Sequence, residues 1–318
     1  MHITPDIALS SWLPYKLREQ ETAHWMYTGT EPYTEPFFDE TIHKCRSLPE
    51  NSKLKRSVSS CDILPEWSLP NTLQPSAIIF HVSRCGSTLL SQLLGIDKRH
   101  VVLSEVPFFD ELLRAKYAGT GKDLSALLPH AISFYGQKRV GNETRLFIKS
   151  DSWHLFFYEQ WRALYPGIPF ILLYRRPDEV IFSQEKKRGM HAVPGVIEKE
   201  VFTLGNLPED FHLNPNGYMA AVLEQYYTKM KQIHLSDSNA YLINYNEGLA
   251  TVAEKVYTLT HTSLQQADRQ AFQERCVYDA KEPEKNFQGL APDESKIAPY
   301  MEKAFQLYQA LELLRVPQ

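Results

Sequence analysis

Cysteine is scarce in this sequence, and the few cysteines lie far apart. Four occur in 318 residues. They neither form a CxxC pair nor show the spacing of a zinc site, and four scattered thiols do not build a disulfide framework. This scarcity argues against a disulfide-rich secreted protein and against a structural metal site, and it favours a reducing, cytoplasmic location. The four are Cys45, Cys61, Cys85 and Cys276.

Long apolar runs and a strong charge of one sign are also missing. No stretch approaches the roughly 20 apolar residues that a membrane helix needs, and the chain does not begin with a basic and then apolar signal segment. The formal net charge is −4, so the chain as a whole does not attract nucleic acid or an anionic membrane. We expect neither a nucleic-acid partner nor a membrane span, and any anion site must be built locally.

What is present is an ordinary globular composition. Hydrophobic residues make up 43% of the chain and charged residues 23%, so the chain can bury a sizeable core without metals or disulfides. Residues 1–70 differ from the rest because they are rich in aromatic residues and end in a polar passage punctuated by prolines. We therefore expect an irregular, aromatic-rich N-terminal extension over residues 1–70, packed on one large domain over residues 71–318.

From residue 76 onward, apolar strand patterns alternate with helical patterns. Residues 77–82 form a short apolar run typical of a buried parallel strand, and residues 87–94 have helical periodicity and end at Gly95. This alternation predicts an α/β fold, with a parallel sheet flanked by helices on both faces and ligands bound at the carboxyl ends of the strands. The other expected strands are 100–104, 145–149, 168–174 and 241–245, and helices are expected at 152–164 and 177–187.

The loop after the first of these strands has the composition of an anion site. Residues 83–88 read SRCGST, and consecutive backbone N–H groups in a glycine turn that opens a helix form a cradle for phosphate or sulfate. An ATP-binding loop would read GxxxxGK[ST]. Here Ser87 follows Gly86, and the only basic residue, Arg84, precedes the glycine, which argues against ordinary ATP or GTP use. The alternative is a tight turn with Arg84 on the surface.

Three segments resemble the superfamily of sulfotransferases that use 3′-phosphoadenosine 5′-phosphosulfate (PAPS). Residues 84–88 match its first loop, [KR]-x-G-[ST]-[ST], and residues 174–183, YRRPDEVIFS, are similar to its 3′-phosphate segment. In that segment Arg175 leaves a strand and Ser183 lies two turns along the next helix, so both can reach one phosphate. The alternative is a helix start with solvated arginines. Residues 241–249 resemble a late family strand that ends in Y-E-[DE]-L, although Asn246 departs from the usual acid.

The resemblance implies a P-loop-type, sulfotransferase-like fold and a metal-independent activity. A sulfuryl group would pass in line from PAPS to a hydroxyl or amine acceptor, and adenosine 3′,5′-bisphosphate would remain. Arg84 would neutralise charge on the bridging oxygen, and Arg175 with Ser183 would hold the 3′-phosphate. The 5′-phosphate would lie on the loop residues Arg84, Cys85, Gly86, Ser87 and Thr88.

Two carboxyl groups compete for the role of general base. Glu105 matches a glutamate that follows the second strand in the branch that modifies tyrosine or sugars, and we expect desolvation to raise its pKa. The alternative for Glu105 is a helix cap. Asp151 is the competitor, because 149–151 (KSD) stands where cytosolic members carry K-[TS]-H. Lys149 either pairs with the sulfuryl oxygens or is solvated. His81 and His154 are expected to be packed or surface residues.

Other interpretations of the sequence stay open. The aromatic residues of the extension either dock it onto the core or line an acceptor pocket. Lys281, Lys285 and Gly289 either form a flap over the 3′-phosphate or belong to a solvated charged run. The alternative functions are a magnesium-dependent ATP phosphotransferase with a variant loop and a catalytically idle nucleotide- or partner-binding module. No short motif encodes the acceptor class or the oligomeric state.

Overall fold

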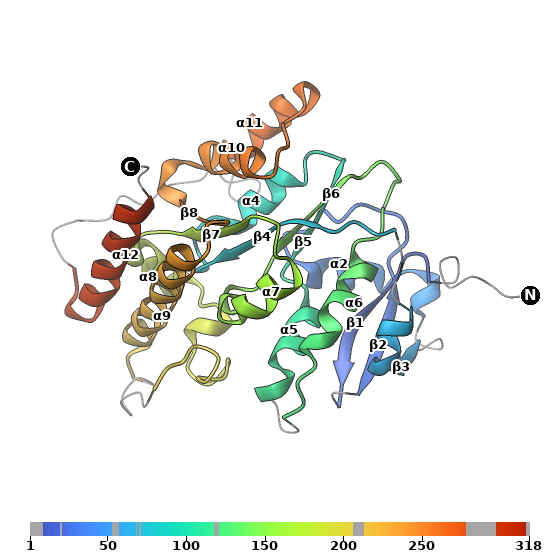
Figure 1. The fold of residues 1–318 in the computed structure, drawn as a ribbon, viewed down its shortest axis with the longest axis horizontal. Helices are drawn as coiled ribbons and strands as arrows, with labels where there is room; N and C mark the ends of the chain where they lie inside the picture. Colours follow the sequence, from blue (N-terminus) through green and yellow to red (C-terminus); the bar gives the residue numbers. More distant parts are fainter. Residues whose placement is uncertain are drawn as a thin grey trace, which may run out of the picture.

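Five parallel strands form the centre of the molecule (Figure 1). The computed structural model describes residues 9–19, 21–52, 57–67, 69, 71–117, 121–205, 213–277 and 297–315. The strand order is β5-β6-β4-β7-β8, with every neighbouring pair parallel. Nearly every strand residue is buried, as expected for a sheet covered on both faces. The strands are β4 (Pro75–His81), β5 (His100–Ser104), β6 (Arg145–Lys149), β7 (Phe170–Tyr174) and β8 (Ala240–Asn244).

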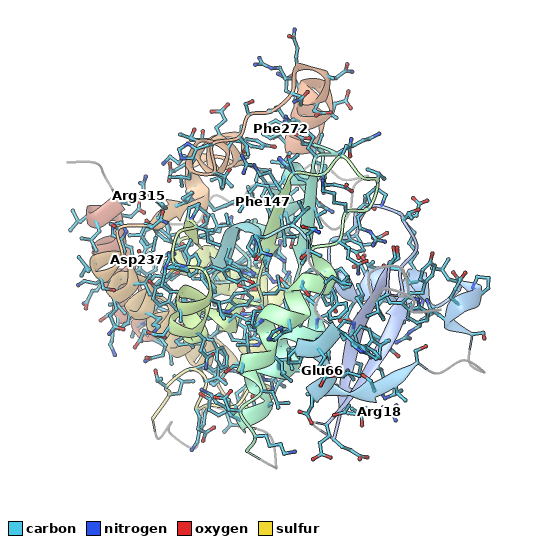
Figure 2. All side chains as sticks on the ribbon, turned by 45° about the vertical axis from the view of Figure 1, so that its right-hand side comes forward. Arg18, Glu66, Phe147, Asp237, Phe272 and Arg315 are labelled. Atoms are coloured by element: carbon cyan, nitrogen blue, oxygen red, sulfur yellow. The ribbon has the colours of Figure 1, made fainter. Side chains whose placement is uncertain are left out.

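Helices flank the sheet, which confirms the predicted α/β class. Figure 1 shows α4 (Ser87–Leu94), α10 (Leu249–Leu259) and α11 (Arg269–Val277) on one side of the sheet. Figure 2 shows side chains filling the space between sheet and helices, with the buried Phe147 of β6 among them. The remaining helices are α5 (Pro107–Arg114), α6 (Leu128–Tyr135), α7 (Tyr158–Leu164), α8 (Pro177–Lys186), α9 (Pro215–Ser236) and α12 (Glu302–Arg315). Short 3-10 turns are η3 (Ala115–Tyr117), η4 (Ser125–Leu127), η5 (Ser152–Phe157), η6 (Met190–Ala192), η8 (Tyr245–Glu247), η9 (Gln266–Asp268) and η10 (Pro299–Met301).

The N-terminal segment is not irregular, and that prediction is wrong. Its strands form a second, antiparallel sheet in the order β1-β2-β3. Pro14 had obscured the first strand, because proline is rare inside strands. The register of β1 against β2 shifts between Pro14 and Lys16, and such a bulge accommodates a residue that cannot donate to the ladder. The elements are β1 (Trp12–Arg18), β2 (Thr22–Tyr27), α2 (Phe38–Cys45), η1 (Pro49–Asn51), β3 (Val58–Ser60), η2 (Cys61–Ile63) and α3 (Leu64–Trp67).

This N-terminal sheet packs on α5 and α6 through aromatic and hydrogen-bonded contacts. The hydroxyl of Tyr135 donates to the backbone carbonyl of Pro14 at 2.6 Å. The guanidinium of Arg139 lies 4.5 Å from the centre of the Tyr33 ring and donates to the carbonyl of Thr28 at 3.1 Å. The two sheets therefore share one continuous core. Most of the N-terminal aromatic residues dock this segment, as one of the two interpretations expected.

The parallel register brings several strand ends to one edge of the central sheet. Lys149 at the end of β6 pairs with Ser104 at the end of β5 and with Ile79 of β4. His81 at the end of β4 pairs with Leu173 near the end of β7. The loops that follow these strands therefore meet, although they are far apart in the chain. In the described ranges, no helix has the length and apolar character needed to cross a bilayer.

Candidate functional site

A cavity of about 520 Å³ opens where the strands β4, β5, β6 and β7 end. Its walls come from the loop after β4, from Glu105 after β5, from residues 151–153 after β6 and from Arg175 after β7. The N-terminal segment adds Phe37 and Asp39. The volume is in the range of small-ligand pockets, roughly 300 to 1,000 Å³. All four loops that the sequence analysis singled out therefore contribute to a single site.

The glycine loop has an unusual backbone. Ser83 and Arg84 have positive φ angles of 64° and 50°, a region that residues with a side chain rarely occupy. Gly86 has φ 74°, and a Cβ at this position would overlap the ring of Tyr245. Glycine is therefore required here for both its conformation and its small size. Such strain is typical of ligand-binding backbone and costs about 1 to 3 kcal/mol per residue.

Helix α4 begins directly after this glycine. Its first N–H groups have no partner within the helix, and the helix dipole favours a negative charge at this end. Gly86, Ser87 and Thr88 all line the cavity. The thiol of Cys85 instead points into the core, 3.6 Å from the carbonyl oxygen of Leu173, and burial raises its pKa to about 11. The thiol of Cys85 therefore does not face the cavity.

The second arginine segment reaches this loop. One guanidinium N–H of Arg175 donates to the backbone carbonyl of Arg84 at 3.2 Å, and another donates to Glu179 at 2.8 Å. The guanidinium also lies 5.0 Å from the centre of the Tyr245 ring, and the side chain is 11% exposed. Arg175 is therefore not a solvated residue. Ser183 lies on the same cavity wall.

Two other arginines near this contact, Arg84 and Arg176, differ in their surroundings. The guanidinium of Arg84 lines the cavity and donates to the backbone carbonyl of Lys187, just after α8. Arg176 pairs with Asp178 at 2.7 Å and does not belong to the cavity wall. Arg84 and Arg175 thus supply the positive charge at this end of the cavity, which we call the loop end (residues 83–88 with Arg175 and Ser183).

Glu105 faces the cavity from the end of β5, but its pKa does not shift as expected. Its backbone is left-handed, with φ 53°, and its N–H donates to the carbonyl of Lys149 at 2.8 Å. Its carboxylate accepts from the ammonium of Lys149 and lies 3.5 Å from Nε2 of His81. Burial alone would raise the pKa of Glu105, but Lys149 and His81 outweigh burial and hold the pKa well below its ordinary value. The expected rise is therefore wrong.

Lys149 is neither solvated nor on the cavity wall. Its side chain is fully buried, and its ammonium lies 4.9 Å from the centre of the Phe37 ring. Glu105 and Phe37, both of which line the cavity, lie between its ammonium and the cavity. The solvated interpretation of Lys149 is therefore wrong, and a contact between its ammonium and the sulfuryl oxygens stays a prediction. In the structure its ammonium pairs with Glu105 from the buried side of that carboxylate.

His81 is a site residue that the sequence analysis placed in the packing. Its Nδ1 accepts from the N–H of Ser83 at 3.0 Å, and its Nε2 donates to the carbonyl of Ser150 at 3.0 Å. Burial lowers the pKa of His81, so the ring is neutral with the proton on Nε2. The ring joins the glycine loop to Glu105. The only signal in the sequence was its place two residues before the loop.

Asp151 lines the cavity but differs from Glu105 in its charge state. The residue is 7% exposed, and its Oδ2 has no hydrogen-bond partner among the described residues. Burial raises the pKa of Asp151 well above its ordinary value, and the carboxylates of Asp110 and Glu105 raise it further. Burial thus favours the protonated form of Asp151, whereas Lys149 favours the ionised form of Glu105.

Asp110, Asp151 and His154 offer possible metal ligands within 4.8 Å of one another. However, Asp110 already accepts from the indole N–H of Trp153 at 2.5 Å and from Arg114 at 2.9 Å. His154 lies 3.1 Å from the same carboxylate and is buried, as expected of a packed residue. These groups form a hydrogen-bonded network in which Asp110 has little capacity left for a cation.

Another part of the cavity wall is acidic, and the sequence analysis had identified only two of its carboxyl groups, Glu105 and Asp151. We call Asp39, Glu105, Glu111 and Asp151, which line the cavity together with Asp110, the carboxyl end. Glu111 accepts from the N–H of Leu17 at 2.5 Å, and burial raises its pKa to about 7. Asp39 and Glu111 match no local pattern in the sequence, and only folding brings them to the same cavity as Glu105 and Asp151. His191 and Tyr245 also line the cavity and were missed.

The proposed flap residues Lys281, Lys285 and Gly289 lie outside the described part of the chain. Helix α12 lies after them in the chain. Its Tyr308 hydroxyl accepts from the side-chain amide of Asn244 at the end of β8. This helix covers the last strand and does not line the cavity.

Three solved structures of sulfotransferases are similar to this chain. For the sulfotransferase domain from the curacin biosynthetic pathway, the TM-score is 0.46 and the identity 16%, over 76% of this chain and 99% of that chain. For a sulfotransferase from Alicyclobacillus acidocaldarius the values are 0.36 and 16%, over 64% and 93%. For sulfotransferase STF1 from Mycobacterium tuberculosis H37Rv they are 0.39 and 12%, over 63% and 71%. No protein-family model and no curated protein matches the sequence.

Proposed function

We propose that this protein is a PAPS-dependent sulfotransferase that modifies a hydroxyl or amine acceptor without a metal. The contact between Arg175 and the backbone of Arg84 carries the proposal. This contact joins two cationic segments that are 91 residues apart in the chain, and both segments line the same cavity. A nucleotide with phosphates on both its 3′ and 5′ oxygens needs two such anion sites, whereas ATP needs one extended site for a single phosphate chain.

The loop end fits PAPS in shape and charge. The left-handed Gly86 and the start of α4 offer backbone N–H groups and hydroxyls for the 5′-phosphate. Arg175 and Ser183 line the same cavity, and in this proposal they hold the 3′-phosphate. Arg84 provides the positive charge next to the 5′-phosphate position. The absence of a lysine after Gly86 disfavours the phosphotransferase alternative.

PAPS supplies an activated sulfuryl group, whose sulfur gains a bond to the acceptor oxygen or nitrogen and loses its bond to the 5′-phosphate. In this proposal Glu105 takes the acceptor's proton, because Lys149 favours the ionised form of its carboxylate, whereas burial favours the protonated form of Asp151. Its low pKa makes it a weak base. A weak base suffices here, since an oxygen that is forming a bond to sulfur becomes strongly acidic.

Lys149 and His81 act through Glu105. The Lys149 ammonium keeps the carboxylate ionised and turned toward the cavity, and the neutral His81 ring fixes it relative to Ser83. The place of this chain in the branch that modifies tyrosine or sugars, and its cytoplasmic location, stay predictions.

A thermal-shift titration tests the proposal. We expect adenosine 3′,5′-bisphosphate to stabilise the protein, by about 2.7 kcal/mol at 100 times its dissociation constant, more than adenosine 5′-monophosphate or magnesium-ATP does. Selective stabilisation by magnesium-ATP would indicate a phosphotransferase. Incubation with PAPS and a library of acceptors, followed by mass spectrometry, separates an enzyme from an idle module. An enzyme adds one SO₃ group, about 80 Da, to an acceptor, whereas an idle module binds the bisphosphate and modifies no acceptor.

A further inference from the structure

His191 is buried in the cavity wall, and the transfer as described so far gives it no role. It lies in η6, just after α8, and the residue is 3% exposed. Gly189 permits this position, because a Cβ there would come within 2.9 Å of the His191 ring. Burial lowers the pKa of His191 to about 3, so the ring is neutral and carries a single N–H. The nitrogen that holds this proton decides what the ring can contact.

A buried glutamine fixes the tautomer of the ring. The side-chain oxygen of Gln184 accepts from the backbone N–H of Gly189 at 2.8 Å, which orients the amide. The amide nitrogen of Gln184 therefore lies 3.1 Å from Nε2 of His191 as a donor. A neutral imidazole that accepts on one nitrogen carries its proton on the other. The N–H of His191 is therefore on Nδ1.

This N–H is available to a ligand in the cavity. Nδ1 of His191 has no hydrogen-bond partner among the described residues, but solvent reaches it, whereas Oδ2 of Asp151 is both unpartnered and sealed. Two other ring N–H groups of the wall are already in use. The indole of Trp153 donates to Asp110 at 2.5 Å, and Nε2 of His81 donates to a backbone carbonyl. His191 thus offers the cavity a ring donor that the fold does not use.

The ring lies near both groups that the proposed transfer uses. Arg84 and Glu105 are close enough to affect the charge of His191. The segment that carries the ring is also tied to the glycine loop. Arg84 donates to the backbone carbonyl four residues before His191, and the amide nitrogen of Gln184 lies 3.5 Å from the hydroxyl of Ser83. A group that passes from the loop end to an acceptor beside Glu105 therefore passes close to His191.

We propose that the Nδ1–H of His191 donates a hydrogen bond to the sulfuryl group of PAPS and holds that group in line with the acceptor. This proposal rests on the proposed function. In the transfer, the sulfur gains a bond to the acceptor oxygen or nitrogen, and the electron pair of its broken bond stays on the 5′-phosphate oxygen. The acceptor's proton goes to Glu105. His191 keeps its own proton throughout, so it acts as a donor and not as an acid or base.

A comparison of two ligands tests the proposal. PAPS and adenosine 3′,5′-bisphosphate differ in the sulfuryl group, so the ratio of their affinities reports contacts to that group. His191→Phe keeps a ring and removes the N–H. Because a hydrogen bond to a charged group is lost, PAPS should bind about tenfold or more weakly to this variant, while the bisphosphate should bind as before. Isothermal titration calorimetry on the full chain, without acceptor, measures both affinities.

His191→Asn is the matched control. The amide nitrogen of asparagine can occupy the place of Nδ1, so this variant should keep most of the affinity for PAPS that the phenylalanine variant loses. Turnover with an acceptor of the natural protein should fall about 10²-fold in His191→Phe, the size of effect expected when a reacting group is misplaced by about 1 Å. Much of that turnover should return in His191→Asn. Thermal melting shows that both variants fold.

Two results would overturn the proposal. If His191→Phe weakened PAPS and the bisphosphate equally, the ring would only support the glycine loop. If the affinity for PAPS were unchanged while the KM for the acceptor rose, His191 would bind the acceptor instead. Failure of the proposed function looks different, because the natural protein would then bind neither PAPS nor the bisphosphate, and His191 would have no sulfuryl group to hold.

Discussion

The two ends of the cavity are built in different ways. At the loop end, five of the six residues 83–88 line the cavity, and three of residues 83–86 have a left-handed backbone. At the carboxyl end, side chains from four separate segments converge, and their charge states depend on one another. A site formed by consecutive residues can be predicted from a short sequence motif, whereas a site formed by distant segments exists only after the chain has folded. The predictions that follow test each end in turn.

The largest effect is expected for Glu105→Gln at the junction of the two ends. Removal of the base should lower turnover with PAPS by about 10²- to 10⁴-fold. The measurement is the rate of adenosine 3′,5′-bisphosphate release with a fixed acceptor. Affinity for the bisphosphate should be unchanged, because Glu105 faces the acceptor. Turnover within threefold of the natural protein would remove Glu105 from the mechanism.

A double variant separates this loss from a loss of folding. Glu105→Gln leaves the buried Lys149 ammonium without its carboxylate, and breaking such a pair costs about 3 to 5 kcal/mol of stability. Glu105→Gln combined with Lys149→Met removes both charges. We expect the unfolding free energy to recover in urea titrations while turnover stays low.

Gly86→Ala should damage the loop end selectively. The added methyl group meets the Tyr245 ring, and the left-handed backbone penalises any side chain, so affinity for the bisphosphate should fall by about 2 to 5 kcal/mol. Gly167→Ala is the control, because a Cβ there meets nothing within 4 Å. Undiminished binding by the Gly86 variant would contradict the loop as the nucleotide cradle.

Arg175→Ala should weaken the bisphosphate more than the monophosphate. Loss of a charged hydrogen-bond donor costs about 1.5 to 3 kcal/mol, so the dissociation constant for adenosine 3′,5′-bisphosphate should rise roughly 10- to 150-fold. Adenosine 5′-monophosphate, which lacks the 3′-phosphate, should lose little affinity. Arg176→Ala, on the adjacent residue outside the cavity, is the matched control. Equal losses in the two variants would mean that neither arginine contacts the ligand.

The last and smallest expected effect is that of Glu111→Gln, at the carboxyl end, on the free energy of unfolding. Glu111 has a pKa of about 7 in the folded protein, above its ordinary value, so the folded state holds a proton that the unfolded state releases. Stability from this group is complete below about pH 4.5 and is lost as the pH rises to about 7. Glu111→Gln should therefore be more stable than the natural protein at pH 8, by about 2 kcal/mol. Urea unfolding at pH 4.5 and 8 measures the unfolding free energies of both proteins. If the free energy of the variant changed with pH as much as that of the natural protein, the raised pKa of Glu111 would be contradicted.

Much of the central sheet could be predicted from the sequence. The strands over 100–104 and 145–149 agree with β5 and β6 at both ends, because buried parallel strands are uninterrupted apolar runs. The helix after the glycine loop also ends where Gly95 predicted. The antiparallel N-terminal sheet was missed because Pro14 lies inside its first strand, and a bulge that tolerates proline has no local signature.

The sequence alone determined the parallel sheet, the glycine loop and the arginine that follows β7, because periodicity and short motifs depend on neighbours in the chain. Only the tertiary structure decided in which direction the pKa of each candidate base shifts. In the sequence Glu105 is the first choice and Asp151 its competitor. In the structure Glu105 lies against the buried ammonium of Lys149, and Asp151 faces other carboxylates. A pKa responds to charges within a few ångströms in space. Those neighbours come from segments that only folding brings together.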